Sequence, residues 1–298
     1  VSLHIANGYR WLGDKWLKKK QPQAKILRAA GSFAHPNVFG AFLIAGILAG
    51  YYFYTLTGRR GLKLVLALAL FLQICALQIT YSRAAFYGWA LATFLWVAFY
   101  YWQKKAWPYS LITLFTLCYA FCFVLFYDQI LQKGGFVSYT EQTRASDEGR
   151  LFFQKIAFKM IQDRPLIGIG YKNYVKAMPR YSRRPLAQDK LFPVHNIYLL
   201  VLAETGLLGL IALIAFLITV LWRCRRVLQD LAGATVAAVL LAILLIGNCD
   251  HFLLTVTSGK WLFFALPALL RLSVSDIAAK KDDRALLHKT GFAAPTPS

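Results

Sequence analysis

The sequence predicts an all-α membrane protein, a polytopic bundle of about seven transmembrane helices with one large extracytoplasmic loop that contains a further helix. Of the 298 residues, 58% are hydrophobic and 16% are charged, whereas soluble domains average about 45–50% apolar and about 25% charged residues. Apolar runs also recur along the chain, and several approach the ~20 residues that a helix needs to cross a bilayer. These runs lie near residues 38–56, 62–80, 84–102, 109–127, 197–222, 233–250 and 260–275.

The net charge of +21 at pH 7 could indicate a nucleic-acid partner, but the pattern of charge argues against one. The basic residues form no stripe with interleaved aromatic residues, as a nucleic-acid surface would. They are divided between short links and one large loop, a distribution that suits anionic lipid surfaces and phosphate-bearing substrates. We therefore expect the lipid bilayer, and no nucleic acid, as a partner.

The five cysteines lie in or beside apolar runs and none falls in the long loop, so the sequence predicts no disulfide framework. Cys118 and Cys122 share a helix face at a spacing of four residues. They have no histidine or carboxylate neighbours, and we interpret them as a packed pair and not as a metal site.

Residues 1–37 form a basic segment without a spanning run, expected to be extracytoplasmic or interfacial. Its apolar residues recur at helical spacing, which predicts a helix lying in the membrane interface, although a solvated basic linker fits equally well. These residues are Ile5, Tyr9, Leu12 and Trp16. The chain begins with Val1 and shows no signal-peptide pattern, so an N-terminal truncation is expected. The segment ends in the turn-rich residues 31–37, where Pro36 can occupy the first turn of the next helix.

The links between the apolar runs alternate in charge. The links on one side carry Arg59, Arg60, Lys63, Lys104, Lys105, Arg223, Arg225, Arg226, Lys280, Lys281 and Arg284. The short links on the other side carry only Arg83 and Lys260. By the positive-inside rule the basic side is cytoplasmic, including the tail at residues 276–298. His35, Arg83, the loop 128–194, His195 and His251 then face outside within a transmembrane domain that covers residues 38–275.

The stretch from Leu62 to Trp102 has to fold back on itself. As one helix it would be ~60 Å long, twice the thickness of the bilayer core. The turn is expected near residues 81–83, which places Arg83 at the outer surface. Its guanidinium could simply extend to the lipid headgroups, or it could bind a phosphate with its planar fork of donors.

The loop 128–194 predicts a helix of its own. Ser146, Asp147 and Glu148 resemble a helix start, so the helix should run from about Arg150 to Asp163, before a proline at position 165. A cation in a first turn gains nothing from the helix dipole, which favours an anion-binding role for Arg150 over that of a plain solvated arginine.

Two further features of the loop are weaker signals. Residues 168–170 form a Gly-Ile-Gly turn and not a dinucleotide-binding loop, because no strand precedes them. Tyr171, Tyr174 and Tyr181 could stack on sugar rings, or they could be ordinary interface aromatics.

The stretch 192–206 closes the loop and opens the fifth apolar run. Counted at ~1.5 Å per residue from the basic cluster 223–226, this helix crosses a ~30 Å hydrocarbon layer by about Ala203. His195 then lies about two turns outside the lipid, where an imidazole could reach a lipid-linked phosphate or sugar. Glu204 is nine positions further and points about 180° away, so we expect it to bind a basic neighbour or to cap a break at Gly206.

Asp250 and His251 lie where the sixth run reaches the outer face. The carboxylate could orient an imidazole or a guanidinium near Arg83 and His195. Simple polarity at a helix end explains the pair slightly better.

Taken together, these motifs resemble the O-antigen ligase and polymerase family of membrane glycosyltransferases, from residue 31 to about residue 270. The motifs are Gly31-Ser32-Phe33-Ala34-His35-Pro36-Asn37, Tyr81-Ser82-Arg83-Ala84, the Arg150 helix with residues 163–170, His195-Asn196-Ile197-Tyr198-Leu199, and Glu204-Thr205-Gly206. The resemblance implies that Arg83 and Arg150 bind a carrier diphosphate and that His195 is catalytic. Asn196, Glu204, His35, Asp250 and His251 are candidates for supporting roles. The family usually has several further spans upstream.

The function expected from this resemblance is glycan transfer from undecaprenyl diphosphate to an acceptor hydroxyl, on the periplasmic face of a bacterial inner membrane. His195 would act as the base, and no metal or cofactor is expected. An O-antigen ligase would use lipid A core as the acceptor. An O-antigen or exopolysaccharide polymerase would use a second carrier-linked glycan, and an O-linked protein glycosyltransferase would use a protein.

A polysaccharide or lipid transporter is the alternative from another functional class. A transporter is expected to have ionisable residues near mid-membrane and internal repeats. The apolar runs have almost no charge at their centres, and the chain shows no repeat.

Overall fold

A computed structural model describes residues 5–6, 9–12, 15–18, 28–125, 127, 141–182, 191–223, 225 and 230–270. The helices are α1 (Pro36–Leu56), α2 (Arg60–Ile79), α3 (Arg83–Lys104), α4 (Tyr109–Leu125), α6 (Glu141–Asp163), α7 (Tyr174–Tyr181), α8 (Ile197–Arg223), α9 (Leu231–Gly247) and α10 (Phe252–Thr255). Residues 257–270 are helical as well. The predicted tail 276–298 lies outside the described residues.

The helical membrane architecture agrees with the prediction, and within the described residues four helices are long and apolar enough to cross a bilayer. These are α1, α2, α3 and the Ile197–Trp222 part of α8. The predicted spans near 109–127 and 233–250 correspond to α4 and α9, which are apolar but have 17 residues each. The last predicted span is described only as far as residue 270. The chain is therefore a multi-pass membrane protein.

Strands replace the interfacial helix that was predicted near the N-terminus. β1 (Ile5–Ala6), β2 (Tyr9–Leu12) and β3 (Lys15–Lys18) form an antiparallel sheet in the order β1-β2-β3. The sequence between consecutive strands is Asn-Gly in one case and Gly-Asp in the other, which are residue pairs typical of two-residue hairpin turns. Strands therefore form here in spite of the helical spacing of the apolar residues.

The bundle is built on tight contacts between α1, α3 and α9. Gly88 of α3 faces the side chain of Ile246 and a backbone carbonyl of α9, so the two helices approach closely there. Trp96 is buried, and its indole N–H donates to Thr235 Oγ1 at 2.8 Å. α2 packs on α1 and α4 packs on α2. This packing fixes where the helix ends lie.

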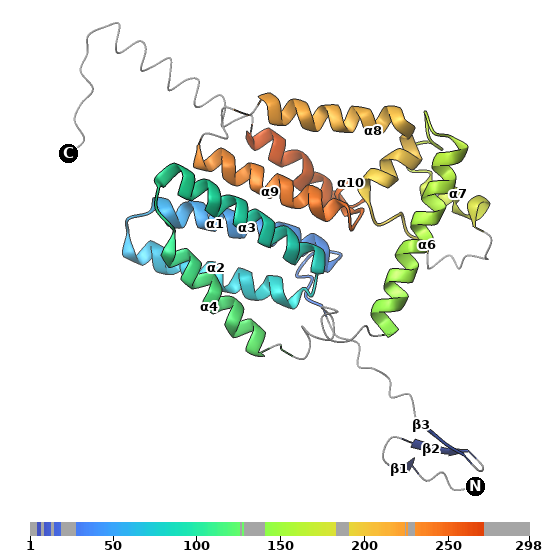
Figure 1. Cartoon of the computed structure of the whole chain (residues 1–298), viewed down its shortest axis with the longest axis horizontal. Helices are drawn as coiled ribbons and strands as arrows, with labels where there is room; N and C mark the ends of the chain where they lie inside the picture. Colours follow the sequence, from blue (N-terminus) through green and yellow to red (C-terminus); the bar gives the residue numbers. More distant parts are fainter. Residues whose placement is uncertain are drawn as a thin grey trace, which may run out of the picture.

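Candidate residues gather at one end of this bundle. α6 runs across that end (Figure 1). The α2–α3 turn falls there as predicted, because α2 ends at Ile79 and α3 begins at Arg83. The start of α1, with Pro36 in its first turn as predicted, and the turn after α9 lie at the same end. The α1–α2 link, which holds Arg59, lies at the opposite end.

α6 is longer than predicted. It ends at Asp163 before the proline, as expected, but it begins at Glu141, so the proposed start at residues 146–148 is wrong. Glu141, Gln142, Arg144 and Ala145 are good helix formers, and they extend the helix beyond the small and acidic residues that resemble a cap. Asp147 consequently lies inside the helix.

α8 contains a break at Gly206, where φ is 68° and ψ is −168°. This backbone conformation is essentially restricted to glycine. The loop 165–170 lies against the break and bonds its free backbone groups. Ile169 N–H donates to Ala203 O at 3.0 Å, and Leu207 N–H donates to the carbonyl of Pro165 at 2.8 Å. Backbone hydrogen bonds therefore join the loop 165–170 to α8 at this break, and we call this contact the joint.

Gly206→Ala is expected to destabilise the protein by at least about 2 kcal/mol, because a Cβ would overlap the carbonyl of Leu166 and the backbone conformation disfavours any side chain. Gly61→Ala, at a glycine with open space around it, is the matched control. Thermal unfolding in detergent should show a melting temperature several degrees lower for Gly206→Ala alone. Equal melting temperatures for the two variants would contradict the joint.

Candidate active site

A hydrogen-bonded network ties the start of α1 to the turn after α9. His35 caps α1, and its Nδ1 accepts from Asn37 N–H at 3.2 Å. The Asn37 side chain donates to Asp250 through its amide nitrogen and accepts from Arg28 through its oxygen, the latter at 3.0 Å. Arg28 also donates to the carbonyl of Thr80 at 2.8 Å. Three separate segments are held at one place by these bonds.

Asp250 is buried, with 4% of its surface exposed, and its carboxylate accepts hydrogen bonds from backbone N–H groups. One oxygen accepts from His251 N–H at 2.7 Å and from Phe252 N–H, at the start of α10, at 3.3 Å. The other oxygen accepts from Asn37. The carboxylate thus bonds backbone N–H groups and an amide, while the His251 ring lies 2.7 Å from Thr255 Oγ1.

His195 lies between two rings. Its centroid is 6.2 Å from that of Phe153 and 5.1 Å from that of His251. Its Nδ1 is buried and has no hydrogen-bond partner among the described residues. The next residue, Asn196, fixes the start of α8, since its side-chain oxygen accepts from the N–H groups of Tyr198 and Leu199 at 2.9 and 3.0 Å. Asn196 therefore positions the imidazole through the backbone.

Burial, and after it the neighbouring His251, lower the pKa of His195 to about 4. Arg150 and His35 act in the same direction, while Asp250 opposes them. Burial also lowers the pKa values of His35 and His251. At neutral pH the imidazole of His195 is uncharged and able to accept a proton. Sequence alone suggested an ordinary value near ~6.5, because burial cannot be read from it.

Arg83 and Arg150 meet at one carboxylate. Arg83 Nη2 lies 3.3 Å from Asp147 Oδ1, and Arg150 Nη1 lies 4.0 Å from the same atom. The side chain of Arg83 is 38% exposed, that of Arg150 is 37% exposed and that of Asp147 is 27% exposed. Ion pairs with this much exposure contribute little to stability, so an incoming anion can replace the carboxylate. Sequence analysis missed this role of Asp147, although its spacing of three residues from Arg150 was a signal.

α6 connects the arginine pair to the histidine. Arg150 is among the causes that lower the pKa values of both His195 and His35. Phe153, three residues further along the same helix face, carries the stacking contact to His195. α6 thus carries both Arg150, which shares Asp147 with Arg83, and Phe153, which stacks on His195.

Glu204 belongs to a different part of the molecule, as its predicted direction implied. It accepts from Lys172 N–H at 2.9 Å and from Tyr174 N–H at 3.1 Å, so its carboxylate holds the start of α7. Its partner Lys172 is basic, as anticipated, but the bond uses the backbone. Tyr174 is 1% exposed, and its hydroxyl donates to the carbonyl of Phe153 at 2.6 Å, so its ring is not open to a sugar.

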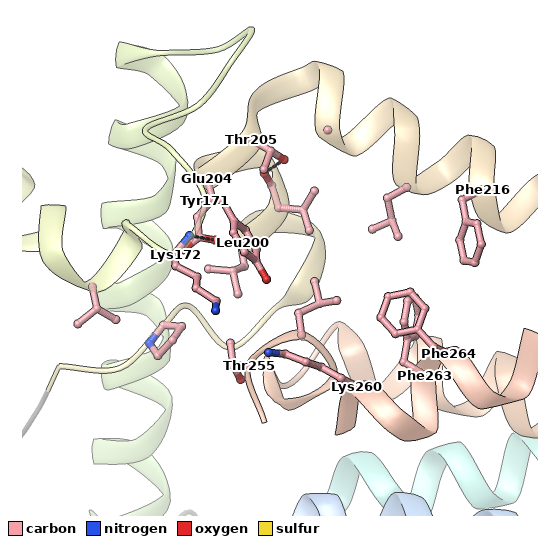
Figure 2. A pocket seen from close by; sticks show the side chains of 16 residues that line it. Tyr171, Lys172, Leu200, Glu204, Thr205, Phe216, Thr255, Lys260, Phe263 and Phe264 are labelled. Atoms are coloured by element: carbon pink, nitrogen blue, oxygen red, sulfur yellow. Dashed lines mark hydrogen bonds between the residues drawn. The ribbon is translucent and has the colours of Figure 1, made fainter. Parts of the chain in front are cut away.

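A groove of about 620 Å³ opens beside the histidines, between α7, α8, α10 and the helix 257–270. Lys172 and Lys260 lie toward one end, and Phe216, Phe263 and Phe264 lie toward the other (Figure 2). Its lining is mostly apolar and includes Thr255, the partner of the His251 ring. The groove therefore extends from the end of the bundle that carries the polar residues to the apolar side chains of α8 and the helix 257–270.

The sequence of the chain is similar to that of one protein family. Residues 68–214 match the model of the O-antigen ligase family. This segment, just under half of the chain, is similar to the O-antigen ligase family. The matched segment contains Arg83, Asp147, Arg150 and His195, whereas His35, Asp250 and His251 lie outside it. No curated protein matches the chain. Within the described part of the chain, no three His, Cys, Asp or Glu residues are grouped so that they could hold a metal ion.

Proposed function

We propose that the protein transfers a glycan from a polyprenyl diphosphate carrier to an acceptor hydroxyl. One observation supports this most strongly: two guanidiniums share a single exchangeable carboxylate beside a buried, uncharged imidazole. Guanidinium pairs suit a diphosphate because each presents a planar fork of donors to phosphate oxygens. The O-antigen ligase family match supports a glycosyltransferase-type reaction.

In the proposed reaction, the bond between the anomeric carbon and the diphosphate oxygen breaks. The electron pair leaves with the diphosphate, whose growing charge Arg83 and Arg150 stabilise. The acceptor oxygen forms the new bond to the anomeric carbon, and its proton passes to His195. No step requires a metal or a cofactor.

The supporting residues have separate proposed roles. Asn196 sets the position of His195 through the start of α8. His35 and Asp250 hold α1 against the turn after α9, and His251 covers one side of the catalytic ring. Glu204 fixes α7 and the loop, at a distance from the chemistry.

We place the reaction on the periplasmic face of a bacterial inner membrane, with undecaprenyl diphosphate as the carrier. Arg59, Lys104 and Lys105 lie in links remote from the site, and basic links favour the cytoplasmic side. α6 and α7 then belong to the extracytoplasmic loop. Our first proposal for the acceptor is lipid A core, which would make the protein a ligase.

Deletion of the gene, followed by lipopolysaccharide gels, tests the acceptor. Cores without any added glycan are expected for a lost ligase, and the wild-type gene should restore long chains. Cores capped by single repeats would instead indicate a polymerase, and unchanged lipopolysaccharide with unglycosylated surface proteins would indicate a protein glycosyltransferase. If deletion leaves every glycan unchanged, the proposed function is wrong.

A further inference from the structure

A second cavity, which has a polar lining, lies between the C-terminal end of α6 and the helix α7. Its volume is about 530 Å³, and its polar lining consists of Asp163, Arg164, Asn173, Lys176, Arg180 and Tyr181. Thirteen residues of α6 separate Arg150 from Asp163, which corresponds to ~20 Å along the helix. This cavity is therefore distinct from the arginine pair and His195, and the proposed reaction does not use it.

The cavity carries an excess of positive charge. Three of its residues are cations and one is a carboxylate. That carboxylate, Asp163, accepts from the hydroxyl of Tyr181 at 2.6 Å, and this bond raises the pKa of the tyrosine. Lys159 adds a further cation nearby, since its ammonium donates to the carbonyl of Tyr181 at 2.9 Å. None of the three lining cations forms an ion pair within the part of the chain that the structure describes.

This arrangement of charge does not stabilise the fold. Lys176 and Arg180 lie four residues apart on an eight-residue helix, where like charges repel and destabilise the helix. Two bonds to Glu204, together with buried Tyr174 and Met178, hold α7 in place against this repulsion. Cations that line a cavity and have no ion-pair partner among the described residues favour the binding of an anion.

We propose that this cavity binds a phosphate-bearing saccharide. Arg164 and Arg180 can bond phosphate oxygens through their planar forks, and Asn173 can bond a sugar hydroxyl. The partly buried side chain of Tyr181, which lines the cavity, offers a ring edge or face to a sugar. A volume of about 530 Å³ falls in the ~300–1,000 Å³ range of small-molecule sites. The role of this cavity as an anchor for the acceptor rests on the proposed function. The binding of a phosphate-bearing saccharide to it does not depend on that function.

The test measures binding of a hexose 6-phosphate to the purified full chain in neutral detergent. We expect the double variant Lys176→Gln/Arg180→Gln to bind at least about tenfold more weakly than wild type, because charged hydrogen bonds to phosphate are lost. Unphosphorylated hexose should bind neither protein measurably. Arg59→Gln, at the opposite end of the bundle, is the matched control and should bind as wild type does.

The source of the phosphate is resolved by competition with lipid vesicles. A saccharide site predicts that vesicles of phosphatidylglycerol displace the hexose phosphate no better than vesicles of phosphatidylcholine. Displacement only by the anionic vesicles supports the same phosphate chemistry with a lipid headgroup as its source. Equal binding to wild type and the double variant, or no binding to either, overturns the proposal. His195→Ala should bind normally, so a failure of the proposed transfer reaction is distinguishable.

Discussion

Replacing His195 with alanine is expected to lower glycan transfer by about 10²–10⁴-fold, the range that a positioned general base contributes. The imidazole is uncharged at neutral pH, and its buried Nδ1 has no hydrogen-bond partner among the described residues, which suits it to take the acceptor proton. The measurement is transfer from a polyprenyl-diphosphate-linked glycan in purified membranes, with expression levels matched. Donor binding should change little, because the diphosphate contacts are assigned to the arginines.

His251→Ala is the control for this prediction. His251 touches the ring of His195 but receives no proton in the proposed reaction, so its loss should cost about tenfold or less. If both variants lose activity equally, the base cannot be assigned to His195. If His195→Ala retains wild-type rates, the proposed mechanism is wrong.

The pH dependence of transfer provides a second measurement on the same two variants. Since the pKa of His195 lies at about 4, kcat/KM should stay level as the pH falls through 6.5, and it should decline only as the pH approaches the lowered value. His251→Ala removes a charge that lowers this pKa, so the decline should begin at higher pH. Between about pH 6.5 and pH 4 the unfolded chain binds more protons at His195 than the folded protein does. The free energy of unfolding therefore decreases as the pH is lowered through this range, and it must be monitored.

Local signals in the sequence predicted a large part of the fold. The turn at residues 81–83 followed from the length of the apolar stretch, the start of α1 from Pro36, and the end of α6 from the proline after Asp163. Each of these depends on residues within about one helical turn. The N-terminal sheet was missed because alternating and helical spacings cannot be separated over such short segments.

The remainder depends on contacts between distant residues. Gly168 and Gly206 are 38 positions apart, and nothing in the sequence indicates that the loop packs against a break in α8. Asp147 looked like a helix cap because sequence alone cannot show that Arg83, 64 positions earlier, lies 3.3 Å away. The burial of His195 was hidden for the same reason, since Phe153 and His251 come from two other elements.

Replacing Arg83 or Arg150 with alanine is expected to lower kcat/KM for the glycan donor by about 10²–10³-fold each, the usual cost of removing one donor to a developing anion. Both guanidiniums point at one carboxylate oxygen, so they are positioned to share one anionic ligand. A lysine at either position keeps the charge but loses the fork, and it should restore activity only in part. Donor titrations in purified membranes give kcat and KM separately.

Asp147→Asn separates anion binding from a purely structural role of this cluster. If Asp147 occupies the place that the diphosphate takes, the amide removes a competing charge, and KM for the donor should fall. If the carboxylate only holds α6 against α3, its loss should raise KM and lower the melting temperature together. Because these pairs are partly solvent-exposed, their contribution to stability is small. The first outcome therefore follows from the geometry, and the second would remove the arginine pair from the proposed site.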